Sequence, residues 1–433
     1  MDTKLSRRAA VAAAASAAIA SGAASKPAAL GGAPVRTSPF PTWPVWETTD
    51  ETEWMRVLRS GKWYRGSGKA VDAFEQKFAE AMGSPHCLAV ANGTSALMVA
   101  LHGLDVQPGD EVLVPPYTFI ATINAVLSKS ALPVFVDTDA RTFQMDTSKL
   151  ESRVTDRTVA AIPVDMAGAP PDLDTAVAAG RQLGIKILED AAQAHLGEWR
   201  GRKLGTITGA GTFSFQASKN LNSGEGGAIL SSDGAFIERC YAFHTNSSPR
   251  RGSTPAPAQG GNFRLTEFQA TLLVSQMTRL EAQAKRRDAN ATYLARRFTE
   301  IGGVTPAALT DGCTRSAWHL FMFRYSAADF AGLPRDKFLK AMAAEGIPCS
   351  SGYTPLNKQA FLKNVLAGRG YQRLFSGKRL QQWHEQNHCP VNDKLCTEAA
   401  WFTQNLLLGT RNDMDQIVAA VEKIKNHAKE LAR

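Results

Sequence analysis

Short apolar runs bounded by turn residues recur through the first half of the chain, and segments with helical spacing lie between them. The runs predict strands at residues 87–91, 111–114, 133–136, 160–164, 186–189, 212–215 and 228–231. Strands that alternate with helices favour an α/β fold with a largely parallel sheet covered on both faces. Ligands of such sheets bind at the carboxyl ends of the strands, so polar residues at those ends are the first candidates for a functional site.

The pattern changes after the last of these strands. A loop rich in proline and glycine, residues 245–261, interrupts any helix, and a crossing to a partner subunit is one role open to it. A long helix over 266–298 then leads to a smaller α+β C-terminal domain, which closes with an amphipathic helix at 414–431. The polar segment 363–388 predicts a surface helix pair, with a substrate lid as the alternative.

Lys219 stands between a predicted strand and a glycine-rich turn, in the stretch F-S-F-Q-A-S-K-N-L-N-S-G-E-G-G of residues 213–227. A lysine that condenses with an aldehyde must be partly desolvated, and the backbone around it must leave room for the aldehyde. The glycines that follow provide that room. The stretch indicates a Schiff-base lysine, and a solvated loop lysine is the alternative.

Asp190 ends the apolar run at 185–190, where a carboxylate would face the cleft. Pyridoxal phosphate, a cofactor that forms Schiff bases with lysine, needs an anion at its ring nitrogen, because the protonated ring withdraws electrons from the substrate. Asp190 fits that role, and a helix N-cap or a surface ion pair is the alternative. Gln193 and His195 are candidates to bind the cofactor's phenolic oxygen, although a structural histidine is equally consistent for His195.

Asn92, Gly93 and Thr94 form a turn between a predicted buried strand and the helix that follows it. Free backbone N–H groups and the helix dipole make such a turn an anion site, and the hydroxyls of Thr94 and Ser95 add donors. Ser214 is a further candidate donor. The alternative is an ordinary turn capped by Thr94 or Ser95.

Phe119 lies where another apolar strand meets a helix, within residues 112–123. It is a candidate to stack on a flat ring, whereas aromatic residues at such junctions otherwise belong to the core. The lysine, the acid, the anion turn and the aromatic residue all fall at or just after predicted strand ends. The fold prediction and the site prediction therefore agree with each other.

In this order, the segments resemble the DegT/DnrJ/EryC1/StrS family of sugar aminotransferases, which are pyridoxal phosphate enzymes of fold type I. The resemblance runs from about Leu30 to the C-terminus. Its motifs are N-G-T-S-A-L at 92–97, P-Y-T-F-I-A-T at 116–122, E-D-A-A-Q-A-H at 189–195, S-F-Q-A-S-K at 214–219, G-N-F-R-L-T-E-F-Q-A at 261–270 and W-H-L-F at 318–321. The expected organisation is an N-terminal arm at 24–60, a large cofactor-binding domain at 61–290 and a small domain at 291–433.

The resemblance implies a role for each candidate. Lys219 would hold the cofactor and then move a proton between the substrate's α-carbon and the cofactor's C4′ atom, while Asp190 would hold the pyridinium. Gln193 would contact the phenolic oxygen, Phe119 would stack on the ring, and Tyr353 would face the substrate, with a buried tyrosine as the equal alternative for Tyr353. The residues implied around the phosphate are Gly93, Thr94, Ser95 and Ser214, together with Asn262 of a second subunit. A homodimer with shared active sites follows from the position of Asn262.

The implied reaction is a ping-pong transfer, in which glutamate or glutamine leaves its amine on the cofactor and a keto-sugar or keto-cyclitol collects it. Residues 30–37 and 401–409 are most similar to the branch that contains scyllo-inosose aminotransferase and 3-amino-5-hydroxybenzoate synthase. Asp165 and Ala167 stand where the family commonly has histidine and an aromatic residue, which leaves the acceptor open.

Two other functions remain for a chain of this family. One is a pyridoxal phosphate-dependent sugar dehydratase, in which histidine replaces the lysine and against which Lys219 argues. The other is a non-catalytic ligand-binding or regulatory protein that keeps the fold.

The N-terminus carries Ser6, Arg7 and Arg8 before an alanine-rich run, a pattern that resembles a twin-arginine signal with a cleavage motif at 21–23. Residues 1–23 are therefore expected to be a signal peptide that exports the protein, for example to a periplasm. A disordered extension on a cytoplasmic protein is the alternative. The run is too short and too interrupted for stable membrane insertion.

Composition adds few constraints. The 433 residues carry a formal charge of +9 and are 44% hydrophobic, enough to bury two cores. The positive charge is not concentrated in one tract, so we expect no nucleic-acid partner. The six cysteines show no C-x-x-C spacing, which argues against a zinc site or a disulfide framework, and no metal is expected.

Overall fold

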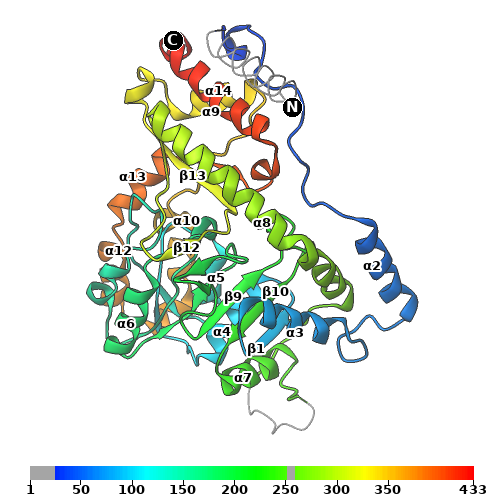
Figure 1. Cartoon of the computed structure of the whole chain (residues 1–433). Coiled ribbons are helices and arrows are strands. Elements are labelled where there is room, and N and C mark those ends of the chain that lie inside the picture. The colour runs from blue at the N-terminus through cyan, green and yellow to red at the C-terminus, as the bar shows by residue number, and fades with distance from the viewer. Residues whose placement is uncertain (1–24, 251–258) are drawn as a thin grey trace.

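The computed structural model describes residues 25–250 and 259–433, so the predicted signal peptide and residues 251–258 of the predicted loop lie outside the described parts. The large domain is built on one twisted sheet (Figure 1). Its strands are β1 (His86–Val90), β2 (Glu111–Val114), β3 (Leu132–Phe135), β4 (Thr158–Ala161), β5 (Lys186–Ile187), β6 (Glu189–Asp190), β9 (Ala210–Ser214) and β10 (Gly227–Ser231).

The two four-stranded groups, β3-β2-β4-β5 and β6-β9-β10-β1, form one continuous surface. Leu188 lies between β5 and β6 and donates its N–H to Ala161 at 2.9 Å, and Val164 forms a parallel bridge with Asp190. β5 and β6 are therefore two halves of one strand. β10 pairs antiparallel with both β9 and β1, and the other pairs are parallel. The predicted α/β fold with a mostly parallel sheet is confirmed.

Helices cover both faces of the sheet because its strands are apolar on both sides. In β1, Leu88 and Val90 join one buried cluster, whereas Cys87 and Ala89 join another on the opposite face. The covering helices are α3 (Ala70–Met82), α4 (Gly93–Gly103), α5 (Ala121–Ser128), α6 (Leu173–Leu183) and α7 (Gly234–His244).

The helix α8 (Glu267–Ile301) begins at a capping box, in which Thr266 caps the helix and Gln269 reaches back. It leads into a third buried cluster, which includes Phe298, Phe321 and Phe402. The elements of this cluster are β11 (Val304–Pro306), β13 (Leu320–Tyr325), β14 (Ala399–Thr403), α9 (Arg335–Ala344) and α14 (Arg411–Asn426). The closing helix predicted at 414–431 is split, since α15 (Ala428–Ala432) follows α14 after His427.

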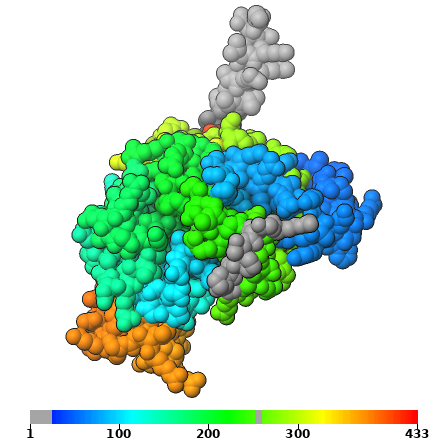
Figure 2. Space-filling model, turned by 90° about the horizontal axis from the view of Figure 1, so that it is seen from below, coloured from blue at the N-terminus to red at the C-terminus, as the bar shows by residue number. Residues whose placement is uncertain are grey.

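The polar segment 363–388 folds differently from the expected helix pair. It contains α10 (Ala360–Leu366), α11 (Arg369–Leu374) and α12 (Gly377–Gln386), and α13 (Pro390–Glu398) follows. Its apolar side chains join the core of the large sheet, where Trp383 Nε1 donates to the Pro133 carbonyl at 2.6 Å and the Tyr371 hydroxyl donates to the Ala131 carbonyl at 2.9 Å. Figure 2 shows this segment, in orange, as a projection beside the cyan part of the large domain.

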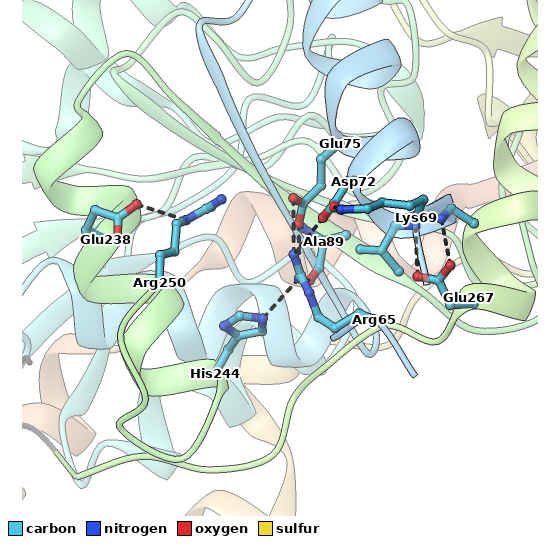
Figure 3. Close-up of polar contacts among 11 residues, drawn as sticks. Arg65, Lys69, Asp72, Glu75, Ala89, Glu238, His244, Arg250 and Glu267 are labelled. Atoms are coloured by element: carbon cyan, nitrogen blue, oxygen red, sulfur yellow. Dashed lines mark hydrogen bonds and ion pairs between the residues drawn. The ribbon is translucent and has the colours of Figure 1, made fainter. Parts of the chain in front are cut away.

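A buried polar cluster ties α3 to β1 and α7 (Figure 3). The Arg65 guanidinium pairs with Glu75 at 3.1 Å, and Glu75 also accepts the Ala89 N–H at 2.8 Å. Arg65 Nη1 lies 3.3 Å from His244 Nε2, and His244 Nδ1 lies 2.6 Å from the Tyr241 carbonyl. Because arginine can only donate, Nε2 accepts and Nδ1 carries the proton. Burial lowers the pKa of His244 to about 3, which agrees with a neutral ring.

The N-terminal arm runs along the outside of the molecule to α2 (Thr48–Ser60), which projects beside the start of α8 (Figure 1). Arg36 pairs with Asp413 at 2.6 Å, and Asp50 pairs with Arg279 at 2.6 Å. Among the helices of residues 25–250 and 259–433, none is both long and apolar enough to cross a bilayer.

Candidate active site

Lys219 lies in the turn between β9 and β10, at the carboxyl end of β9. Its N–H donates to the Gln216 carbonyl at 2.8 Å, and Ala217 donates to Gly224, which closes the turn. Gly224 has a φ of +83°, a conformation that glycine adopts without strain. Burial lowers the pKa of Lys219 to about 8, and the nearby charge of Asp190 opposes the change. The neutral, nucleophilic amine is therefore accessible close to neutral pH.

Asp190 is buried at the end of β6, close enough to Lys219 for each charge to affect the pKa of the other. Its carboxylate accepts the Thr122 hydroxyl at 2.9 Å and the Ala192 N–H at 3.2 Å. Burial raises the pKa of Asp190, while these two donors and Lys219 oppose the rise. A protonated ring nitrogen beside this carboxylate would supply the cation that it lacks.

Two further acids lie behind Asp190. Asp165 and Glu189 are both fully buried, and the Asp165 N–H donates to the Asp190 carbonyl at 3.0 Å. Glu189 accepts the N–H groups of Gly205 at 2.5 Å and Ile207 at 3.1 Å, donors that favour its charged form. Burial and the neighbouring Glu189 raise the pKa of Asp165 well above its usual value, which favours the protonated form of Asp165.

The turn before α4 is open for an anion. Asn92 caps the helix by accepting the Ser95 N–H at 2.8 Å, so neither Thr94 nor Ser95 is the cap. In the described parts of the chain, the N–H groups of Gly93 and Thr94 and the hydroxyls of Thr94 and Ser95 donate to no protein group. A Cβ on Gly93 would lie 2.6 Å from the Ser214 Cβ, so glycine is what lets the start of α4 approach the end of β9.

Gln193 and Tyr353 lie next to each other and near Asp190. Gln193 is buried and accepts the Ala167 N–H through Oε1 at 2.8 Å. Burial raises the pKa of Tyr353 to about 12, and a hydrogen bond with Gln193 opposes this change. The Tyr353 ring packs edge-on against Tyr117 and Trp401, with centroids 5.5 Å and 4.9 Å away. Tyr117, Tyr353 and Trp401 together form an aromatic wall.

His195 and His319 are both buried and neutral. His195 packs against Phe213 and Phe215, and burial lowers its pKa to about 3, an environment that favours the structural alternative. His319 is not among the predicted site residues, although it belongs to the W-H-L-F motif at 318–321. Its Nδ1 lies 3.2 Å from Asn220 Oδ1, and burial together with the Lys219 charge keeps its pKa well below the usual value.

Phe119 and Asn262 are exposed. Phe119 precedes α5 and exposes 56% of its surface, so it does not belong to the core of this chain. Asn262 lies in a bridge with Thr245, and its neighbour Arg264 bridges Val90. No contact within the described chain joins Asn262 to Lys219 or Asp190. The same holds for Phe119, so among the described residues these two predicted site residues have no contact with Lys219 or Asp190.

The clustered residues fit pyridoxal phosphate. Among the described residues, the glycine-dependent turn has free donors for a phosphate, Asp190 is a buried acid without a salt bridge, and Lys219 is a desolvated amine near Asp190. Together with the sheet topology, this defines a fold type I enzyme of the pyridoxal phosphate class. Within residues 25–250 and 259–433, no group of acids, histidines and cysteines could hold a metal ion.

The chain belongs to the DegT/DnrJ/EryC1/StrS aminotransferase family, whose model matches residues 46–422, and it is an aminotransferase. It is 36% identical to the L-glutamine:2-deoxy-scyllo-inosose aminotransferase of Streptoalloteichus tenebrarius, over 92% of this chain and 97% of that protein. It is 32% identical to the 3-amino-5-hydroxybenzoate synthase of Amycolatopsis mediterranei, over 85% and 93% of the two chains. A crystal structure of 3-amino-5-hydroxybenzoic acid synthase superposes with a TM-score of 0.80 and 30% identity, over 91% of this chain and 100% of the other.

These comparisons confirm the family and the branch that the sequence motifs indicate. The comparisons do not account for the two departures from the common family pattern, at Asp165 and Ala167. Ala167 is buried with a φ of +62°, and its carbonyl accepts the His319 N–H at 2.8 Å. The alanine side chain makes fewer contacts near Gln193 than an aromatic side chain at this position would make.

Proposed function

We propose that this protein binds pyridoxal phosphate and transfers the amino group of glutamine or glutamate to a keto-cyclitol or keto-sugar. The observation that carries the proposal is the placement of a desolvated Lys219 beside the buried Asp190 and the open anion turn, all at one edge of the sheet. When bound, the cofactor supplies an electron sink that stabilises the negative charge formed at the substrate's α-carbon.

The side chains of this chain do the rest of the chemistry. Lys219 is the residue that would hold the cofactor, because its neutral amine can condense with an aldehyde with loss of water, and a donor amine would free it again. The freed Lys219 amine would then act as the base for the donor's α-carbon proton and would return that proton to the cofactor side. Asp190 keeps the proton on the ring nitrogen, and Thr122 and Ala192 fix the carboxylate for that contact. Gln193 would hold the phenolic side of the ring, and Phe119 would cover one of its faces.

The donor and the acceptor are proposed from the named relatives. One of them is by name an L-glutamine:2-deoxy-scyllo-inosose aminotransferase, which supports glutamine as donor and a keto-cyclitol as acceptor. The aromatic wall of Tyr117, Tyr353 and Trp401 supports a ring-shaped acceptor, because cyclitol and sugar rings pack their C–H faces on aromatic side chains.

We also propose a homodimer in which Asn262 contacts the phosphate of the partner's cofactor. The exposure of Asn262 and the lack of a contact between it and Lys219 within one chain support this arrangement. A mixture of a Lys219→Ala variant and an Asn262→Ala variant tests it. Mixed dimers regain one complete site, so activity should exceed that of either variant alone. Activity that stays at the sum of the two variants would argue for sites contained in one chain.

A half-reaction screen tests the proposed activity. Glutamine or glutamate should bleach the visible absorption of the yellow protein, and a keto-cyclitol or keto-sugar added afterwards should restore it. Bound cofactor without a donor-driven spectral change would favour the non-catalytic ligand-binding alternative. Loss of water from a deoxysugar without a requirement for a donor would favour the dehydratase.

The cellular location is a separate proposal. The paired Arg7 and Arg8 ahead of an alanine-rich run support export of the folded protein by the twin-arginine route. A fusion of residues 1–30 to a reporter should be exported, and replacement of both arginines by lysine should retain the reporter in the cytoplasm. Equal export by the two fusions would contradict the proposal.

A further inference from the structure

The N-terminal arm contacts the lysine turn directly. Trp43 Nε1 donates to the Lys219 carbonyl at 3.2 Å, although the two residues are 176 positions apart. Asn222 Nδ2 donates to the same carbonyl, also at 3.2 Å. The backbone of Lys219 is therefore held by one side chain from its own turn and by one from a distant part of the chain.

The arm is fixed on both sides of Trp43. Two positions before it, the Pro41 carbonyl accepts Asn405 Nδ2 at 2.8 Å, and two positions after it, the Val45 carbonyl accepts Arg279 Nη2 at 3.1 Å. Asn405 follows β14 of the small domain, and Arg279 lies on α8. Trp43 is thus held at the junction of three parts of the fold rather than on a loose tail.

Arg287 lies beneath the indole ring and is fully buried, with its guanidinium carbon 5.2 Å from the ring centroid. Its Nε and Nη2 donate to Gln404 Oε1 at 2.8 Å and 2.5 Å, and Gln404 Nε2 donates to the Ser218 carbonyl at 3.4 Å. No ion pair joins Arg287 to a carboxylate in the described parts of the chain. A buried cation without a carboxylate depends on neutral partners and on a cover that excludes water, and the indole supplies that cover together with a cation–π contact.

The carbonyls of Ser218 and Lys219 are consecutive, and each is held by this network. Gln404 holds the first, and Trp43 holds the second. The lysine side chain has four rotatable bonds, so the position of its nitrogen depends on how firmly its backbone is anchored. A displacement of about 1 Å at a reacting group costs up to about a hundredfold in rate.

From this geometry we infer that Trp43 is a positioning residue for Lys219, which makes the N-terminal arm part of the catalytic centre. The inference rests on the proposed aminotransferase function. Trp43 acts through the lysine backbone and touches neither substrate nor cofactor in this role. By anchoring the Lys219 backbone, Trp43 determines the position from which the lysine nitrogen reaches the substrate's α-carbon.

The test compares Trp43→Phe, which keeps an aromatic cover over Arg287 but removes the N–H donor, with Trp46→Phe. Trp46 lies in the same arm and is 70% exposed, so it provides a matched control. In the holoenzyme, three quantities are measured: the rate at which glutamine bleaches the visible absorption, the pH midpoint of that absorption, and hydrogen exchange of residues 214–224. Thermal unfolding confirms that each variant is folded.

Trp43→Phe should slow the bleaching by about threefold to tenfold, the effect of one neutral hydrogen bond. It should also shift the pH midpoint and speed hydrogen exchange in the lysine turn, while Trp46→Phe changes none of the three. Wild-type values for Trp43→Phe in rate, midpoint and exchange would overturn the inference. If the wild-type protein shows no donor-driven bleaching, the proposed function fails, and the exchange data alone then decide whether Trp43 anchors the turn.

Discussion

Gly93 is the position at which the phosphate turn is most sensitive to a single added carbon. In a Gly93→Ala variant, the new Cβ would lie 2.6 Å from the Ser214 Cβ, with the Ser214 Oγ at 3.0 Å. Carbon atoms pack at about 3.5–4.0 Å, so the start of α4 and the end of β9 must separate by about 1 Å. Overpacking of this kind costs about 1–3 kcal/mol. If the strain is relieved by opening the turn, affinity for pyridoxal phosphate falls by about fivefold to 150-fold.

The assay is a titration of the apoprotein with pyridoxal phosphate, followed by absorption. Gly377→Ala is the control, because a Cβ at Gly377 meets no heavy atom within 4 Å. Ser214→Gly removes the opposing Cβ and leaves the Ser214 Cα, 3.2 Å away, as the next contact. In that background, Gly93→Ala should therefore cost much less than in the wild type. Wild-type affinity in Gly93→Ala, or an equal loss in both backgrounds, would refute the assignment of this turn as the phosphate site.

Three more predictions concern the acid and the amine. Burial lowers the pKa of Lys219 to about 8, so the rate at which apoprotein captures pyridoxal phosphate should rise with pH through that value and level off above it; a rate that rises only near 10.5 would contradict a desolvated amine. Thr122→Val removes a donor to the Asp190 carboxylate at 2.9 Å and should slow the donor half-reaction by about tenfold to 150-fold, because a hydrogen bond to a charged group contributes about 1.5–3 kcal/mol; an unchanged rate would show that Thr122 does not fix Asp190. The pKa of Asp165 is raised in the folded protein, so its contribution to stability falls as pH rises above the usual value of 3.8; Asp165→Asn should therefore be more stable than the wild type in urea at neutral pH, and lower stability would contradict a protonated Asp165.

The strands of the large sheet could be predicted because they are short, apolar on both sides and bounded by turn residues. Predicted and observed strands differ mainly at their ends, as at residues 160–164 against Thr158–Ala161 of β4. The sequence does not show that β10 runs antiparallel, because direction depends on pairing and not on pattern. The many polar residues at 363–388 favour a surface location, whereas the few apolar residues of this segment, Trp383 among them, anchor it on β3.

The same distinction, between features set by local sequence and features set by tertiary contacts, applies to the candidate site. Lys219, Asp190 and Gly93 lie directly after strands, where local sequence and sheet topology together define one edge. Thr122 lies inside α5, so its contact with Asp190 depends on how that helix is turned against the sheet. Trp43 reaches the lysine turn from 176 positions away, and no periodicity encodes a contact of that kind.

The proposed function depends most directly on the bond between Lys219 and the cofactor. Borohydride reduction of the yellow holoenzyme, followed by proteolysis and mass spectrometry, locates that bond. We predict one pyridoxyl-modified peptide, spanning Lys219, and none in Lys219→Ala. Modification at another lysine, or none at all in a protein that still bleaches with glutamine, would contradict the central claim.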